Sequence, residues 1–164
     1  MDIFDEETKE RVIPRVIEPT FGVERVFMAV LTESYNDDKA RGNIVLKLHP
    51  QLAPIKVGVF PLVSNDKKVV KKARDVYDLL KDEFHCFYDG GGSIGRRYAR
   101  QDELGTPFCI TIDFDSLDDG SVTIRNRDTT AQVRVQIKKL KDILKKALNG
   151  EKFESFGHVI RKGE

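Results

Sequence analysis

The chain has 164 residues, enough for one domain with a hydrophobic core, or for one domain that carries a short extension from a neighbour. Charged residues make up 34% of the sequence and hydrophobic residues 40%, a balance typical of globular proteins that excludes a mainly disordered or membrane-embedded chain. The acidic start MDIFDEETKER does not resemble a secretory signal, so the cytoplasm is the expected location.

The N-terminal part predicts a strand followed by a helix. Residues 15–19 (RVIEP) are expected to form the strand and residues 21–35 the helix. The helix has apolar residues at helical spacing on one side: Val23, Val26, Phe27, Val30 and Leu31.

A break between two structural units is predicted next. Residues 36–43 (NDDKARGN) are polar, and Pro50 and Pro54 interrupt the periodicity of the stretch that follows. We therefore expect a linker here, with residues 1–43 in one unit and residues 44–164 in a second.

The second unit begins with an alternation of strands and helices. A strand at residues 55–60, a helix over about residues 66–83 and a strand at residues 84–88 would form a βαβ unit. The turn DGGG then leads into a helix, IGRRYARQDEL, which Ser93 can cap and Gly105 can terminate.

Three strands and a helix are expected in the remainder. Residues 108–114 alternate, with Phe108, Ile110, Ile112 and Phe114 on the core face. A turn at residues 118–120 leads to strands at residues 121–126 and 132–137, and a helix with an apolar stripe ends at Gly150. The order βαβαβββα predicts an α/β fold with a mixed five-stranded sheet and three flanking helices.

Three glycines raise the possibility of a nucleotide site. Gly90, Gly92 and Gly95 have the GxGxxG spacing between a strand and a helix that binds dinucleotide phosphates. However, Asp89 places a negative charge at this turn, and two arginines occupy the helical turn that normally packs on the sheet. We favour a tight turn that requires positive φ, and keep a nucleotide-binding or regulatory α/β domain as the alternative function.

The helix after this turn carries three arginines. Arg96 and Arg100 share one face, Arg97 lies about 100° around the helix, and Tyr98 lies between them. Guanidiniums bind phosphates and stack on unpaired bases, and a tyrosine ring adds a stacking surface, so this set suits an unstacked RNA loop. The acidic residues of the same helix allow a salt-bridged surface instead. Two arginines at the end of a later strand can extend the surface: Arg125 and Arg127.

Other chemistry-bearing residues are few. Glu18 and Arg25 flank the strand-to-helix turn of the first unit, where a carboxylate can bind an amine and an arginine a phosphate; a surface ion pair is the alternative. Cys86 and Cys109 lack the spacing of a zinc or redox site and the histidines are scattered, so no metal site is expected.

Together these segments resemble glycyl-tRNA synthetases of the archaeal and eukaryotic type, which are class II enzymes. The runs YDGGGSIGRRYARQDELGTPFCITIDFD and VTIRNRDTTAQVRV are similar to that family's anticodon-binding domain, and FPLV at residues 60–63 matches its first strand. VIEPTFGVERVF resembles motif 3 of the class II catalytic domain. The resemblance covers about residues 14–150 and implies an anticodon-binding domain preceded by a strand-helix remnant of the catalytic domain.

The resemblance also implies roles for individual residues. In the motif 3 segment, Arg25 would bind an ATP phosphate and Glu18 the amino group of glycine; Thr20 stands where the family usually has serine, and Gly22 would let the backbone approach the adenylate. The residues expected to bind RNA are Arg96, Arg97, Tyr98, Arg100, Phe108, Arg125 and Arg127.

Motifs 1 and 2 of class II enzymes have no counterpart in this sequence. Without motif 2, nothing would position glycine and the α-phosphate, so the chain is not expected to aminoacylate alone. ATP with Mg²⁺ would serve the complete enzyme, and no cofactor is expected for this chain. The expected partners are glycine tRNA, through its anticodon loop, and a missing N-terminal catalytic half or a homodimer partner; neither membrane nor DNA is expected. An accessory subunit that lost RNA binding is a further alternative.

Overall fold

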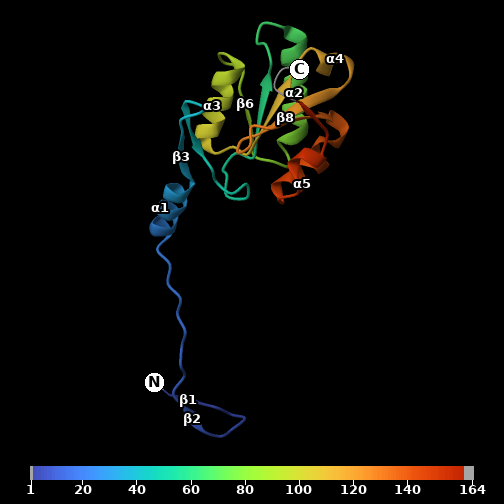
Figure 1. Ribbon diagram of the computed structural model, residues 1–164. Coiled ribbons are helices and arrows are strands. Elements are labelled where there is room, and N and C mark those ends of the chain that lie inside the picture. The colour runs from blue at the N-terminus through green and yellow to red at the C-terminus, as the bar shows by residue number, and fades with distance from the viewer. Residues whose placement is uncertain (1, 161–164) are drawn as a thin grey trace.

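The protein consists of an extended N-terminal arm and a folded body, seen in a computed structural model that describes residues 2–160 (Figure 1). In the arm, the short strands β1 (Ile3–Phe4) and β2 (Arg11–Val12) pair with each other, and α1 (Val23–Ser34) follows a segment without regular structure. The strand expected at residues 15–19 does not form. These residues are exposed, and a strand requires a neighbour to pair with its backbone groups.

The polar stretch expected to be a linker is an ordered hairpin. Helix α1 runs directly into β3 (Tyr35–Asp38), which pairs antiparallel with β4 (Asn43–Leu46). The side chain of Asp38 accepts hydrogen bonds from the backbone amides of Ala40 and Arg41 and so closes the turn. Residue 43, where the sequence predicts the unit boundary, begins the second strand of this hairpin; the division into two units stays a prediction.

Within residues 2–160, the body is built on one mixed sheet of six strands, in the order β10-β9-β8-β7-β5-β6. Its two parallel pairs join β5 to β6 and β5 to β7, and all other pairs are antiparallel. The strands are β5 (Val57–Pro61), β6 (Cys86–Tyr88), β7 (Phe108–Ile112), β8 (Ser121–Asn126), β9 (Gln132–Gln136) and β10 (His158–Ile160). The predicted α/β class and mixed sheet are confirmed; β10 is an additional strand, too short to give a periodic signal.

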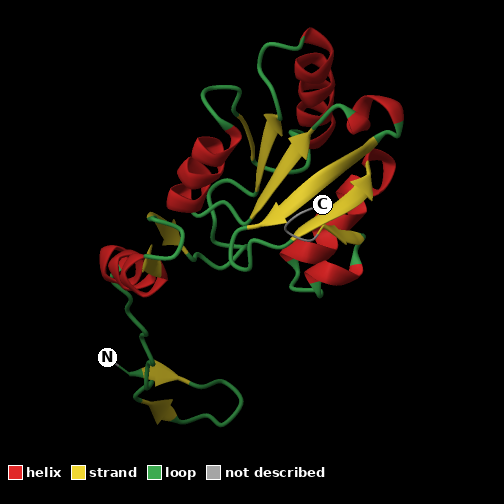
Figure 2. Cartoon of the chain, turned by 45° about the horizontal axis from the view of Figure 1, so that its top comes forward, coloured by secondary structure: helices red, strands yellow, loops and turns green. Residues whose placement is uncertain are grey.

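Helices cover both faces of this sheet (Figure 2). The two faces differ in chemistry. On one face, α2 (Lys67–Leu80) and α5 (Leu140–Leu148) pack apolar side chains against alternate strand residues such as Val59, Ile110 and Ile124. The other face carries α3 (Ile94–Leu104), which meets the polar residues of the same strands, Thr111 and Arg125, through Tyr98. The main core and the polar face are therefore separated by the sheet.

Short helical elements complete the body. They are α4 (Asp115–Asp118), η1 (Ile137–Lys139) and η2 (Phe153–Ser155). Phe114 was expected on the core face, but β7 ends at Ile112, and Phe114 begins the helical turn that links β7 to β8. Its side chain is therefore exposed.

Gly105 provides a test of how closely the hairpin packs on the body. This residue ends α3 with a φ of 78°, and an added Cβ would lie 2.9 Å from Leu48 Cδ1 and 3.0 Å from the carbonyl oxygen of Leu46. Gly120 also has positive φ (63°), but nothing lies within 4 Å of its added Cβ. We expect Gly105→Ala to lower the free energy of unfolding in urea by about 3 kcal/mol and Gly120→Ala by about 1 kcal/mol. Equal losses of unfolding free energy in the two variants would show that the close packing at Gly105 does not contribute to stability.

Candidate nucleic-acid interface

A groove of about 980 Å³ lies on the polar face. It lies between α3, the tip of the β3–β4 hairpin, the turn that joins β8 to β9, and β10. Its polar and charged lining residues include Asp38, Arg41, Asn43, Tyr98, Asp102, Arg125 and Gln132. The groove thus combines guanidiniums, amides and an aromatic ring, the groups with which proteins bind unpaired bases.

Small residues of α3 keep the groove open. Gly95 and Ala99 lie one helical turn apart on the lining face, and an added Cβ at Gly95 would meet nothing within 4 Å. Tyr98, on the same side of the helix, is half-buried, and its hydroxyl shares a hydrogen bond of 2.6 Å with Thr111 Oγ1. Burial raises the pKa of Tyr98, so the phenol remains neutral at physiological pH.

A buried ion pair forms the wall between α3 and the sheet. Arg125 of β8 donates to both carboxylate oxygens of Asp102 at 2.8 and 2.9 Å, and its guanidinium lies 4.8 Å from the centre of the Tyr98 ring. Burial opposes the charge of Arg125, but the hydrogen bonds with Asp102 outweigh it and raise the pKa of Arg125. Arg125 therefore stays charged beside the groove.

Three residues expected to bind RNA are instead enclosed by the body. Arg97 donates to the carbonyl oxygens of Pro61 and Gly92 and to Ser64 Oγ. Arg127 donates to the carbonyl oxygens of Gly105 and Leu48 and pairs with Asp128, and Phe108 stacks on Phe153 at 5.8 Å between ring centres. These side chains are 1–3% exposed, so direct RNA contact by them would require the body to open.

Arg96 and Arg100 lie at the surface, on the face of α3 next to the groove-lining one. Arg100 pairs with Asp89 and donates to the carbonyl oxygen of Gly91 at 2.7 Å, so its carboxylate partner comes from the preceding turn and not from its own helix. Partial burial opposes ionisation of Asp89, but hydrogen bonds from the Gly91 amide and Arg100 outweigh it and lower the pKa of Asp89. Arg96 makes no hydrogen bond or ion pair within residues 2–160 and is available to an external phosphate.

The glycine-rich turn before α3 has the geometry of a tight turn. Gly92 has a φ of 73°, which favours glycine, and the Gly91 amide is already bonded to Asp89. Arg97 and Arg100 hold the carbonyl groups of this turn. These contacts account for Gly92 without a nucleotide.

Comparison with known proteins identifies the body. A family model described as "Anticodon binding domain" matches residues 56–147, more than half of the chain. The chain belongs to this family. Two walls of the groove, α3 and the β8–β9 turn, belong to the matched segment, whereas the β3–β4 hairpin and β10 lie outside it.

Related proteins extend the similarity beyond this domain. The chain is 48% identical over 151 residues to a glycine–tRNA ligase of Clostridium acetobutylicum, covering 90% of this chain and 32% of that protein. It is 50% identical over 143 residues to a glycine–tRNA ligase of Ruminiclostridium cellulolyticum, covering 85% and 30%. The chain thus spans about a third of the length of these relatives.

A solved structure supports the fold. The chain is similar to the crystal structure of prolyl-tRNA synthetase from Cryptosporidium parvum complexed with L-proline and AMP, with a TM-score of 0.59 and 21% sequence identity. The match covers 63% of this chain and 22% of that one. At this identity the similarity concerns the fold alone.

The predicted motif 3 residues lie in the arm, away from the groove. Glu18 and Thr20 belong to the irregular segment, Gly22 precedes α1, and Arg25 lies in its first turn. All four are exposed, and Glu18 and Arg25 form no ion pair with each other.

Within residues 2–160, no helix combines the length and apolar character needed to cross a membrane. In the same range, no three His, Cys, Asp or Glu side chains are grouped as metal ligands.

The anticodon-binding domain should depend strongly on the buried pair of Asp102 and Arg125. Asp102→Asn leaves the guanidinium of Arg125 buried without a counter-charge, so we expect the free energy of unfolding to fall by about 3 kcal/mol. Asp89→Asn removes a carboxylate from a partly exposed pair and should cost less than about 1 kcal/mol. Urea unfolding of both variants measures the difference. If Asp102→Asn lowers the free energy of unfolding as little as Asp89→Asn does, the buried pair does not stabilise the domain as we expect.

Proposed function

We propose that this chain is the C-terminal part of a glycine–tRNA ligase of the archaeal and eukaryotic type, and that its body binds the anticodon loop of glycine tRNA in the groove beside α3. The observation that carries the proposal is the groove itself, a hollow with an aromatic ring and two guanidiniums within an anticodon-binding domain. Similarity to glycine–tRNA ligases over most of the chain supports the choice of amino acid.

The groove offers separate groups for the base and for the backbone of an RNA loop. Tyr98 and Arg125 line the groove with the guanidinium over the ring, and a base can stack against the part of this pair that faces the groove. Asn43 and Gln132 bring side-chain amides that can both donate to and accept from base edges. Arg96, with Arg100 beside it on α3, is placed to bind the phosphates of the same loop.

The arm belongs to the catalytic part of the ligase in this proposal. Residues 1–43 would be the end of the catalytic domain, in which Arg25 binds an ATP phosphate and Glu18 the amino group of glycine, with Thr20 and Gly22 beside the adenylate. ATP and Mg²⁺ would act in the complete cytoplasmic enzyme, and this chain alone would not aminoacylate. The remaining catalytic half or a homodimer partner would supply the other walls of that site.

Binding of RNA stem-loops tests the proposal directly. We expect the chain to bind the glycine tRNA anticodon stem-loop more tightly than the same stem-loop with altered second and third anticodon bases, because the groove reads unpaired bases. Arg96→Ala should weaken binding of both RNAs. The plot of log affinity against log salt concentration falls with salt, and the variant should make this slope less steep by about one. Fluorescence anisotropy at several salt concentrations measures both effects. Lys71→Ala, an exposed change on α2 at the opposite face, is the matched control, and equal affinity for the two RNAs would refute anticodon binding.

The exposed apolar side chains of α1, in the arm, lead us to expect that the chain associates with a second copy of itself or with a catalytic partner. Val26 and Phe27 of α1 are 51% and 60% exposed, so these apolar side chains of the helix are left uncovered by the part of the chain that the structure describes. Analytical sedimentation should show that the chain associates increasingly as its concentration rises. The double variant Val26→Ser, Phe27→Ser should associate less at the same concentrations. Glu33→Ser, on the same helix, should leave association unchanged, and a monomer at all concentrations would count against this role.

A further inference from the structure

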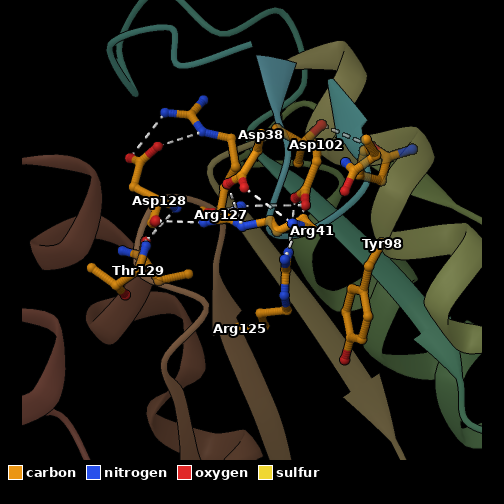
Figure 3. Close-up of polar contacts among 12 residues, drawn as sticks. Asp38, Arg41, Tyr98, Asp102, Arg125, Arg127, Asp128 and Thr129 are labelled. Atoms are coloured by element: carbon orange, nitrogen blue, oxygen red, sulfur yellow. Dashed lines mark hydrogen bonds and ion pairs between the residues drawn. The ribbon is translucent and has the colours of Figure 1, made fainter. Parts of the chain in front are cut away.

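Arg41, at the tip of the β3–β4 hairpin, joins the hairpin to two walls of the groove (Figure 3). Its guanidinium donates to the carbonyl oxygens of Arg127 and Asp128, at 2.7 Å each. The same group pairs with Asp38 at 3.0 Å and lies 3.6 Å from the buried carboxylate of Asp102. One side chain therefore contacts the hairpin, α3 and the turn between β8 and β9.

The turn that Arg41 holds has a strained backbone. Thr129 and Thr130 of this turn line the groove, and Thr130 has a φ of 59°, which is uncommon for a residue with a branched side chain. Such a conformation costs on the order of 1 kcal/mol and persists where its surroundings fix it. The two hydrogen bonds from Arg41 to the preceding carbonyl groups fix this turn from outside it.

Arg41 also balances the charge of the groove wall. The cluster contains three guanidiniums, from Arg41, Arg125 and Arg127, and three carboxylates, from Asp38, Asp102 and Asp128. Without Arg41, the carboxylates would outnumber the guanidiniums, and two of those carboxylates line the groove. An excess negative charge there would repel the phosphates of an RNA loop.

We propose that Arg41 is a positioning residue for RNA discrimination: it sets the shape of the β8–β9 turn and the charge of the wall against which the anticodon bases lie. This inference rests on the proposed binding of the anticodon loop in the same groove. It assigns a role in that site to a segment that lies before the matched anticodon-binding segment, residues 56–147.

The test compares the affinities of Arg41 variants for the two RNA stem-loops described above. Arg41→Ala should weaken binding of the cognate stem-loop about tenfold, and binding of the altered stem-loop about threefold or less, because the turn that contacts the bases is displaced. Arg41→Lys keeps the charge but cannot contact two carbonyl groups and two carboxylates at once. We expect this variant to lose less affinity for the cognate stem-loop than Arg41→Ala does, and still to lose its preference for the cognate over the altered stem-loop. Circular dichroism confirms that each variant is folded.

Lys39→Ala is the matched control, since Lys39 lies in the same turn, carries the same charge and pairs with the exposed Asp37 alone among residues 2–160. It should change both affinities less than about twofold. Folded Arg41→Ala with unchanged discrimination, or an equal loss in Lys39→Ala, would overturn the role of Arg41. If Arg41→Ala does not fold, Arg41→Lys decides in the same way. Absence of discrimination in the unaltered chain would instead refute the proposed function.

Discussion

The buried pair of Asp102 and Arg125 is the constraint on which the polar half of the body depends. Helix α3 meets the sheet on a face that carries hydroxyl and guanidinium groups, so it cannot be held there by apolar packing alone. Two short hydrogen bonds between oppositely charged groups fix the middle of the helix, and the T-shaped contact of Tyr98 with Phe60 assists them. The helix can then turn its small residues, Gly95 and Ala99, toward a volume that no side chain of the described residues fills.

The sequence predicted the sheet and helices well because their signals are local. Alternation in strands and apolar spacing in helices follow directly from which face meets the core, and α2, α5 and the strands of the main core have these patterns. The strand at residues 15–19 was wrong because its local pattern had no neighbour to pair with, and Phe114 was misplaced because one helical turn ends the alternation two residues early. Both errors depend on contacts and chain geometry that periodicity does not contain.

The arginines of the candidate site show even more clearly that a local sequence pattern does not identify the partner of a side chain. An arginine in a sequence is compatible with solvent, RNA or a buried partner, and the partners of Arg97, Arg125 and Arg127 include groups 22 to 79 residues away. The role of Arg41 was missed because it lies in a polar stretch that resembles a linker. A weak signal was present there: an aspartate followed by Gly42 four residues later is typical of an ordered turn.

The junction between the arm and the body determines how α1 is connected to the groove. No loop separates α1 from β3, and the amide of Lys47 donates to the carbonyl oxygen of Ser34 at 2.7 Å, which closes the start of the hairpin. Because Arg41 fixes the other end of this hairpin to the groove wall, α1 and the groove are joined through a short hydrogen-bonded ribbon. This connection fixes the position of α1 relative to the groove. A switch would require a second stable arrangement of the hairpin, and the ion pairs of Arg41 with Asp38 and Asp102 oppose one, because breaking them would leave charges uncompensated.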